Sequence, residues 1–243
     1  KIVFCYSIAT FATMRCLEQI KVNICSMNLP VTIIGAGAGF SFGYDGPTHH
    51  GHQDLSAMRL IPEMEIIELS SGEVARRTVE SLTSRPRPSY IRLDKGPFPE
   101  HDDVKADFSR GIRLVSQIDA GRVAIISNGY MMRVADQVYR SLYTKGYGSK
   151  LLDLFVVKPI NTDYLKSLLE EVDLVISIEE SCVNGGLATS LLEEREKIGK
   201  SWELLAIGAP EKQFIEYGDR EWFHEKYGLT SESIVRRVVN CLK

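Results

Sequence analysis

The feature that most constrains the fold of this chain is a repeated alternation of short apolar runs with longer stretches whose apolar residues recur at helical spacing. Expected strands cover residues 1–7, 29–40, 63–70, 88–96, 122–129, 149–159, 173–181 and 202–210. Expected helices cover residues 9–28, 54–62, 70–85, 132–146, 161–172, 185–199 and 230–243. Strands separated by helices form parallel sheets that helices cover on both faces. The sequence therefore predicts an α/β fold.

One stretch breaks this alternation and divides the chain. Residues 96–111, "GPFPEHDDVKADFSRG", combine two prolines and two glycines with mixed charge, which is typical of a domain linker. We therefore expect two doubly wound, mostly parallel-sheet domains over residues 1–98 and 110–243, joined by a linker over residues 99–109. Because the chain begins with Lys rather than Met, we expect the first domain to be incomplete at its N-terminus.

Charge and cysteine content argue against several classes of function. The net charge of -3 and the scattered basic residues do not favour binding to nucleic acid or to an anionic membrane. No apolar run is long enough to span a bilayer. The five cysteines match no zinc spacing, and free thiols in a reducing cytosol are the simpler interpretation. A redox cluster of Cys5, Cys16 and Cys25 is the alternative, although no CxxC is present. We expect a cytoplasmic protein.

The most polar stretch is "GYDGPTHHGHQDLSAMR", residues 43–59, which holds three histidines and two aspartates after an expected strand. Parallel sheets bind ligands at the carboxyl edge of their strands, so these side chains are well placed for proton transfer or for hydrogen bonds to a hydroxylated substrate. A metal site built from His49, His50, His52 and Asp54 is a second interpretation, which no spaced partner motif supports. A solvated loop, with Asp54 as the N-cap of the next helix, is a third.

Several motifs, in order along the chain, resemble one enzyme family. "YDGPTHHGHQDLSAMRLIPEMEII" resembles the DGPTH…DL…R.IP stretch of transketolases and of 1-deoxyxylulose 5-phosphate synthases. "TFATMRCLEQIK" resembles the helix before that stretch, and "RPSYIRLDKG" resembles the end of the same pyrimidine-binding domain. "DLFVVKPINTDYL", "VISIEESCVNGGLATSL" and "AIGAPEKQFIEYG" resemble the C-terminal domain of the family. The resemblance covers essentially the whole chain.

This resemblance implies a transferase that uses thiamine diphosphate and Mg²⁺ to move two-carbon ketol units between sugars. The chain has no GDG motif for the diphosphate and Mg²⁺, and the glutamate that activates the aminopyrimidine lies upstream of residue 1 in the family pattern. We therefore expect the C-terminal section or subunit of such an enzyme, inactive without an N-terminal partner subunit or segment that supplies the Mg²⁺ ligands. The family is dimeric, so a free chain is expected to aggregate or to form homo- or hetero-oligomers.

The resemblance also assigns residues to the cofactor. Phe11 matches an aromatic side chain that stacks on the aminopyrimidine, and Tyr6 and Ile8 are expected to line the same pocket. A flat apolar face suits a flat ring. The alternative for Phe11 is an ordinary core aromatic at the start of a helix.

A second set of residues is assigned to the substrate. Asp45 matches the aspartate that hydrogen-bonds a hydroxyl of the donor sugar, and His49 matches the catalytic histidine near the substrate carbonyl. Lys95 falls where the family has an arginine that binds the substrate phosphate, and it can supply the charge without the bidentate fork. His50 and His52 have no match and are expected to be part of a solvated loop. We assign no metal ligand in this chain.

The chain also departs from the family pattern. Transketolases usually place a histidine eight residues before the loop aspartate, and the synthases place an arginine seven residues before it; here these positions hold Gly37 and Ala38. We therefore expect a roomier and less basic pocket. "EES" at residues 179–181 stands where the family often has Glu-Glu-His. We assign it no catalytic role, because this domain mostly builds the dimer interface in the family.

Two other functions fit the same two-domain plan. One is the β subunit of a 2-oxo acid dehydrogenase, against which the DGPTHH loop argues. The other is a non-catalytic assembly subunit, which the change at Gly37 and Ala38 permits and which the presence of Asp45 and His49 argues against.

Overall fold

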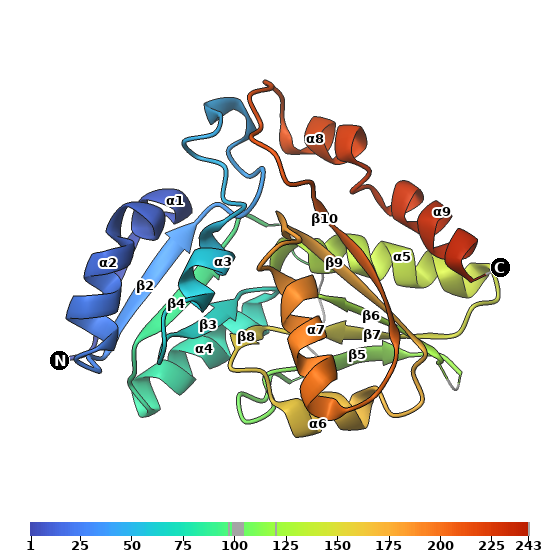
Figure 1. The fold of residues 1–243 in the computed structure, drawn as a ribbon, viewed down its shortest axis with the longest axis horizontal. Helices are drawn as coiled ribbons and strands as arrows, with labels where there is room; N and C mark the ends of the chain where they lie inside the picture. The colour runs from blue at the N-terminus through green and yellow to red at the C-terminus, as the bar shows by residue number, and fades with distance from the viewer. Residues whose placement is uncertain (97, 99–104, 120, 243) are drawn as a thin grey trace.

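A computed structural model describes residues 1–96, 98, 105–119 and 121–242 of the chain. Two five-stranded sheets lie side by side, each covered by helices (Figure 1). This arrangement confirms the predicted fold class of two mostly parallel α/β sheets.

The first sheet has the strand order β1-β2-β4-β3-β8. Its strands are β1 (Val3–Ile8), β2 (Val31–Ala36), β3 (Glu65–Glu68), β4 (Ser89–Leu93) and β8 (Val156–Lys158). Its helical segments are α1 (Ala9–Ala12), α2 (Leu17–Ile20), α3 (Asp54–Arg59) and α4 (Gly72–Ser84). The strands are parallel except β8, which pairs antiparallel with β3.

The second sheet has the strand order β10-β9-β6-β7-β5. Its strands are β5 (Arg113–Gln117), β6 (Val123–Ser127), β7 (Ser149–Asp153), β9 (Leu174–Cys182) and β10 (Glu203–Ala209). Its helices are α5 (Met132–Thr144), α6 (Thr162–Leu168), α7 (Leu187–Ile198), α8 (Arg220–Tyr227) and α9 (Ser231–Cys241). All pairings are parallel except that of β5 with β7.

The expected single strand over residues 149–159 is wrong. The chain forms β7 in the second sheet, crosses over at residues 154–155 and then adds β8 to the first sheet. Backbone hydrogen bonds fix this crossing, because Leu154 N donates to Ser127 O and Glu68 N donates to Phe155 O, each at 2.9 Å. The apolar run would look the same whether it formed one strand or two strands in different sheets. Its composition therefore does not reveal that it belongs to two sheets.

The expected helix over residues 9–28 is interrupted. A 3₁₀ turn (Met14–Cys16) separates α1 from α2, and a π-helical turn (Lys21–Cys25) follows α2. The hydroxyl of Thr13 donates to Ala9 O at 2.6 Å, and Thr13 leaves the regular helical backbone at φ -115° and ψ -73°. A side chain that bonds to the backbone in this way competes with the regular helix. Strand β5 and helix α8 were not predicted either.

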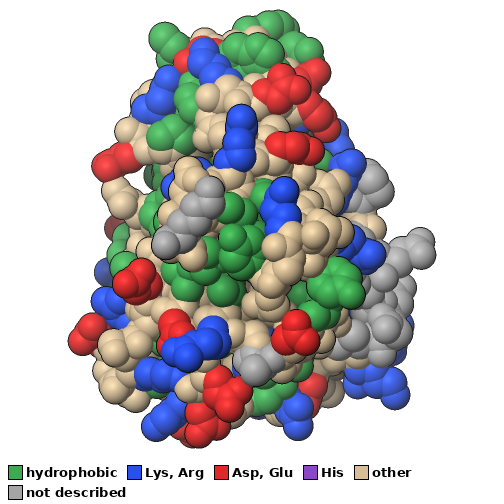
Figure 2. All heavy atoms as spheres, turned by 90° about the vertical axis from the view of Figure 1, so that its right-hand side faces the viewer, with side chains coloured by type: hydrophobic (Ala, Val, Ile, Leu, Met, Phe, Trp, Pro, Cys, Tyr) green, Lys and Arg blue, Asp and Glu red, His purple; other side chains and the backbone are tan. Residues whose placement is uncertain are grey.

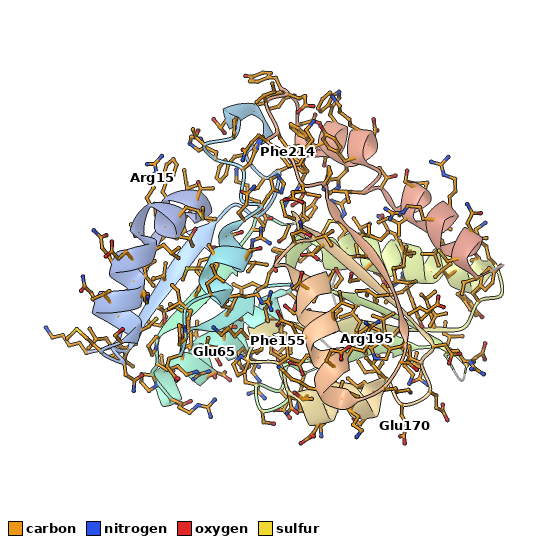
Figure 3. The ribbon with its side chains drawn as sticks, in the orientation of Figure 1. Arg15, Glu65, Phe155, Glu170, Arg195 and Phe214 are labelled. Atoms are coloured by element: carbon orange, nitrogen blue, oxygen red, sulfur yellow. The ribbon has the colours of Figure 1, made fainter. Side chains whose placement is uncertain are left out.

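The division into domains stays a prediction. Residues 99–104, most of the expected linker, lie outside the described residues. The described part of the linker packs on the crossing segment, where the rings of Phe108 and Phe155 lie 5.0 Å apart. Figure 3 labels Phe155, in the crossing segment, and Glu65, in β3 of the first sheet.

Strand β1 is an edge strand that exposes apolar side chains. Val3, Phe4 and Tyr6 are 42%, 43% and 69% exposed.

The opposite end of the molecule, beyond the ends of α5 and α9, also exposes apolar side chains. They gather in the middle of that face, and no histidine is visible on it (Figure 2). Among the described helices, none is both long enough and apolar enough to cross a membrane.

Candidate active site

A loop that follows β2 carries the histidines, and we call residues 37–53 the site loop. Its two ends are joined by an antiparallel bridge in which Gly39 and Gly51 exchange backbone hydrogen bonds of 2.8 and 3.0 Å. The hydroxyl of Thr10, in α1, donates to Thr48 O at 2.9 Å and ties the far side of the loop to that helix. The loop therefore projects from the carboxyl edge of the first sheet, beside α1 (Figure 1).

Aromatic rings and cations form a cluster on the outer side of the site loop. The ring of His49 meets that of Phe11 edge-on, with centroids 4.9 Å apart, and lies 6.1 Å from the ring of Phe42. Lys95 Nζ lies 4.9 Å from the Phe42 centroid, and the guanidinium of Arg15 lies 3.8 Å from the Phe11 centroid. The structure thus brings Phe11, His49 and Lys95 together. Arg15 is labelled beside α1 in Figure 3.

The side chain of His49 has one hydrogen-bond partner among the described residues. Its Nδ1 lies 2.9 Å from the hydroxyl of Thr48. This contact engages one ring nitrogen and fixes the orientation of the imidazole, which leaves Nε2 as the nitrogen that can exchange a proton with a ligand.

Two of the three expected cofactor residues line one pocket. Tyr6 and Phe11 lie on a pocket of about 400 Å³ between β1 and the α1–α2 segment, together with Ala12, Ile24 and Ile33. Ile8 is half-buried and is not part of this lining. The lining is mostly apolar and includes no charged side chain. It therefore fits a flat ring such as a pyrimidine and does not fit a diphosphate with its Mg²⁺.

Asp45 lies in a 3₁₀ turn (Gly43–Asp45) and is exposed. Its backbone N–H donates to Phe42 O at 3.0 Å. Its carboxylate has no hydrogen-bond or ion-pair partner among the described residues, so it is available to accept a hydrogen bond from a ligand. In the part of the chain that the structure describes, no group of three His, Cys, Asp or Glu residues is arranged to hold a metal ion.

The expectation that His50 and His52 are solvated is wrong. Both are buried, and the ring of Phe40 lies 5.6 Å from His50 and 4.2 Å from His52. His50 Nε2 contacts Gly43 O at 3.2 Å, and His52 Nδ1 contacts Glu180 O at 2.9 Å. Burial lowers the pKa of His52 to about 4 and also lowers the pKa of His50. Both rings are therefore neutral at pH 7 and support the loop from inside.

Asp54 is not the N-cap that its position suggested. Helix α3 begins at Asp54, and Gln53, at the cap position, makes no side-chain cap bond. The buried Asp54 carboxylate instead accepts a hydrogen bond of 2.6 Å from the hydroxyl of Tyr90 and pairs with Arg92 at 3.0 Å. By contrast, Ser71 caps helix α4, because its hydroxyl accepts from Val74 N at 3.2 Å.

Arg92 connects the two sheets. It is 2% exposed and donates to Glu68 at 3.2 Å, to Ser181 Oγ at 2.9 Å and to Gly51 O. Glu68 is also buried, and burial raises its pKa to about 7. A buried arginine in this position needs several acceptors at once, which explains why strands from both sheets bring polar side chains to it.

The "EES" motif is buried at this junction. Glu179 accepts hydrogen bonds from the N–H groups of Leu187 and Ala188, at the start of α7, at 2.8 and 2.9 Å. Burial raises the pKa of Glu179 to about 8. Glu180 pairs with Arg220 and with His224, whose Nε2 lies 2.5 Å from Glu180 Oε1. Opposite charge on Arg220 holds the pKa of Glu180 below its usual range despite burial.

Phe42 was not predicted as part of the site, and it corrects the expected pocket shape. Gly37 has a positive φ of 89°, and a Cβ at this position would lie 2.1 Å from the Phe42 ring. Phe42 therefore fills the space that a side chain at residue 37 would enter, so the site is not roomier there. Its ring also carries the Lys95 contact. In the sequence, the one sign that the Phe42 ring takes the space of a side chain at residue 37 was the presence of an aromatic residue five positions after Gly37.

Comparison with known proteins places this geometry in a family. Residues 1–100 match the transketolase pyrimidine-binding domain, and residues 115–234 match the transketolase C-terminal domain. A solved split-gene transketolase, described as an inactive β4 tetramer, has a TM-score of 0.85 and 27% identity, over 99% of this chain and 76% of that chain.

This chain covers different shares of the length of two relatives. The 1-deoxy-D-xylulose-5-phosphate synthase of Acidobacterium capsulatum is 29% identical over 97% of this chain and 37% of that protein. An apulose-4-phosphate transketolase subunit of Phocaeicola vulgatus is 28% identical over 100% of this chain and 77% of that protein. The chain thus spans little more than a third of the synthase. Two matching domains in the family order show that the chain belongs to the transketolase family, as its pyrimidine-binding and C-terminal section.

Proposed function

We propose that this chain is the C-terminal subunit or section of a thiamine-diphosphate-dependent transketolase-like transferase, which moves a two-carbon ketol unit between sugar or sugar phosphate substrates. The observation that carries the proposal is the contact of His49 with Phe11, beside Lys95 and Phe42, at the edge of a transketolase pyrimidine-binding domain. In this proposal, His49 is the proton-transfer group, and it lies next to Phe11, the aromatic side chain that stacks on the cofactor.

Each residue has a distinct task in this proposal. Phe11 and Tyr6 hold the pyrimidine in the apolar pocket, and Ile8, at the end of β1, lies outside the pocket lining. The cofactor, when bound, supplies the stabilisation of negative charge at the carbonyl carbon of the ketol unit. His49 exchanges a proton with a sugar hydroxyl through Nε2 while Thr48 holds its other nitrogen.

The remaining polar groups select and orient the sugar. Asp45 accepts a hydrogen bond from a hydroxyl of the donor, since its carboxylate is exposed and free to do so. Lys95 supplies a positive charge for a substrate phosphate, and its position over Phe42 directs the ammonium toward the site. A single ammonium binds phosphate as a point charge, so we expect weaker selectivity for phosphorylated sugars than an arginine would give.

The diphosphate and Mg²⁺ require a partner in this proposal. The apolar pocket offers no charged side chain for them, and two relatives are named as transketolase subunits. We therefore place those ligands on an N-terminal subunit or segment, and the complete site between polypeptides. The free cysteines fit a reducing compartment, which favours the cytoplasm.

The decisive experiment mixes this chain with a transketolase N-terminal subunit from the same organism, recognised by its GDG…N motif. We expect thiamine diphosphate and Mg²⁺ to bind, and ketol transfer from a ketose phosphate to an aldose acceptor to appear, only in the mixture. Each polypeptide alone is the control. A stable mixed complex that binds the cofactor but transfers no ketol unit would contradict the proposal.

Two further arms of this assay separate the alternatives. Activity on pyruvate or branched-chain 2-oxo acids, in place of sugars, would identify the β subunit of a 2-oxo acid dehydrogenase. Turnover that stays unchanged when His49 is replaced would identify a non-catalytic assembly subunit. A dephosphorylated ketose as donor measures how much Lys95 contributes through phosphate.

A further inference from the structure

We propose that Arg220, in the C-terminal domain, is a positioning residue that fixes the geometry of the active site in the pyrimidine-binding domain. The inference rests on the proposed function, and it assigns a role to a domain that otherwise carries no part of the chemistry. It follows from three sets of contacts made by α8 and β9 with the two segments that carry His49 and Lys95.

The guanidinium of Arg220 reaches both segments at once. It donates to Ala38 O, in the site loop, at 3.1 Å, and it pairs with the carboxylate of Asp94, the residue before Lys95. The same fork is held by Glu180, with hydrogen bonds of 2.8 and 2.5 Å. The start of the site loop and the end of β4 are therefore fixed to one rigid group.

The guanidinium itself is held in a built site. It lies 3.5 Å from the centroid of the Tyr130 ring, and His224 Nε2 donates to the same Glu180 carboxylate at 2.5 Å. Asp94 and Glu180 are 3% and 2% exposed in their side chains. A planar fork that is stacked on a ring and bonded on both edges has little freedom to move.

Glu180 hydrogen-bonds to the site loop through its backbone, and its side chain lies close against Gly39 of the loop. Its carbonyl oxygen accepts from His52 Nδ1 at 2.9 Å, and His52 O accepts from Cys182 N at 3.1 Å. Gly39 has a φ of 50°, and a Cβ there would lie 2.2 Å from Glu180 Oε2. The loop therefore approaches Glu180 so closely that only glycine fits at residue 39.

The chain around the start of α8 shapes the tip of the loop. A Cβ at Gly43 would lie 2.4 Å from Gly218 O, and the rings of Phe40 and Phe223 are stacked with centroids 4.2 Å apart. Figure 1 shows the site loop and the segment before α8 side by side at the top of the molecule, near the Phe214 label of Figure 3. The tip that carries Asp45 thus follows the position of α8.

These contacts differ from an ordinary tie between two domains. Residues 38 and 94 each lie next to, or in the same loop as, a residue that faces the substrate. A shift of either segment moves His49 or Lys95 relative to the cofactor ring. In enzyme sites, a displacement of about 1 Å can lower the rate by roughly 100-fold. We therefore assign Arg220 a role in setting the distance between the proton-transfer group and the phosphate-binding group.

The experiment compares Arg220→Met and Arg220→Lys with Arg236→Met, an exposed arginine on α9 that contacts only Ser233 Oγ among the described residues. Hydrogen–deuterium exchange with mass spectrometry is measured on the chain without its partner, so the result does not depend on ketol transfer. For Arg220→Met we expect about tenfold faster exchange in residues 37–53 and 93–96, and unchanged exchange in β6.

Arg220→Lys keeps the buried charge and therefore the fold, but one ammonium cannot bridge Ala38 O and two carboxylates. We expect it to loosen the same two segments and, in the reconstituted enzyme, to lower kcat/KM by about 10- to 100-fold. Exchange in the site loop equal to wild type, or faster exchange spread evenly over both sheets, would overturn the inference. If Arg220→Met does not fold, Arg220→Lys alone decides. An inactive wild-type mixture would refute the proposed function and leave this result intact.

Discussion

His49 and His52 lie in one loop and have opposite environments. The ring of His49 is half-buried and contacts the ring of Phe11 and the hydroxyl of Thr48, whereas the ring of His52 is 1% exposed and packs on Phe40. The aspartates divide in the same way, since Asp45 is exposed and Asp54 is fully buried between Tyr90 and Arg92. Burial thus separates residues of the same type, and in the proposed function the less buried ones serve the ligand while the buried ones serve the fold.

The largest effect is expected at the buried aspartate. Asp54→Ala should lower the free energy of unfolding by about 3–5 kcal/mol, because it leaves Arg92 buried with a lost partner and removes the acceptor of the Tyr90 hydroxyl. Denaturant unfolding followed by circular dichroism measures this loss. Asp45→Ala is the matched control and should change stability by less than about 0.5 kcal/mol. Equal losses in the two variants would remove the distinction between the two sides of the loop.

A smaller effect, mainly on activity, is expected at the half-buried histidine of the site loop, His49. His49→Ala should lower kcat/KM of the reconstituted enzyme by about 100-fold or more, because it removes the proton-transfer group. Its free energy of unfolding should fall by less than about 1 kcal/mol, since only the Thr48 hydrogen bond and the ring contacts with Phe11 and Phe42 are lost. Steady-state kinetics and thermal unfolding of the same preparation test both statements. A large stability loss with unchanged kcat/KM would place His49 in the structural group.

The smallest effect is a change in pH dependence at the buried side. Unfolded Glu179 is ionised above about pH 4.5, whereas the folded pKa is raised to about 8, so folding takes up a proton between these values. Stability from this group therefore falls as pH rises toward 8. Glu179→Gln cannot titrate, so its stability relative to wild type should rise by about 1.4 kcal/mol per pH unit between roughly pH 6.5 and 8.

The chosen pH range isolates Glu179. His52, with a folded pKa of about 4, contributes only below its unfolded pKa of 6.5. Glu68 titrates in both proteins, so its contribution cancels in the difference except for the part that arises from its charge repulsion with Glu179. Glu196→Gln, at a side chain that is 82% exposed on α7, is the control and should show no such slope. A flat difference for Glu179→Gln would mean that the carboxyl is already ionised in the folded protein.

Apolar periodicity was sufficient to predict most elements and the fold class. It failed where an element is short or polar, as in β5, and where one apolar run serves two sheets, as in β7 and β8. Periodicity reports burial along one element and does not report the element that it pairs with.

The candidate site was predicted only where a motif pointed to it. Phe11, His49 and Lys95 were named from the family motif, and the structure brings them together. The buried network was missed, although charged residues inside apolar strands, such as Arg92 and Glu180, are themselves a signal that partners exist. Which residues pair with these charges depends on how the two sheets pack, and the packing of the sheets cannot be inferred from the pattern of a single sequence.

The exposed edge strand β1 has a consequence for handling the protein. Val3, Phe4 and Tyr6 border an open row of backbone donors and acceptors, which another copy of the same strand can occupy. If the partner subunit of the proposed function binds at this edge, self-association competes with it, and the balance depends on concentration and on the order of addition. Co-expression, or dilution before mixing, favours the complex with the partner, whereas a concentrated stock of the single chain favours self-association.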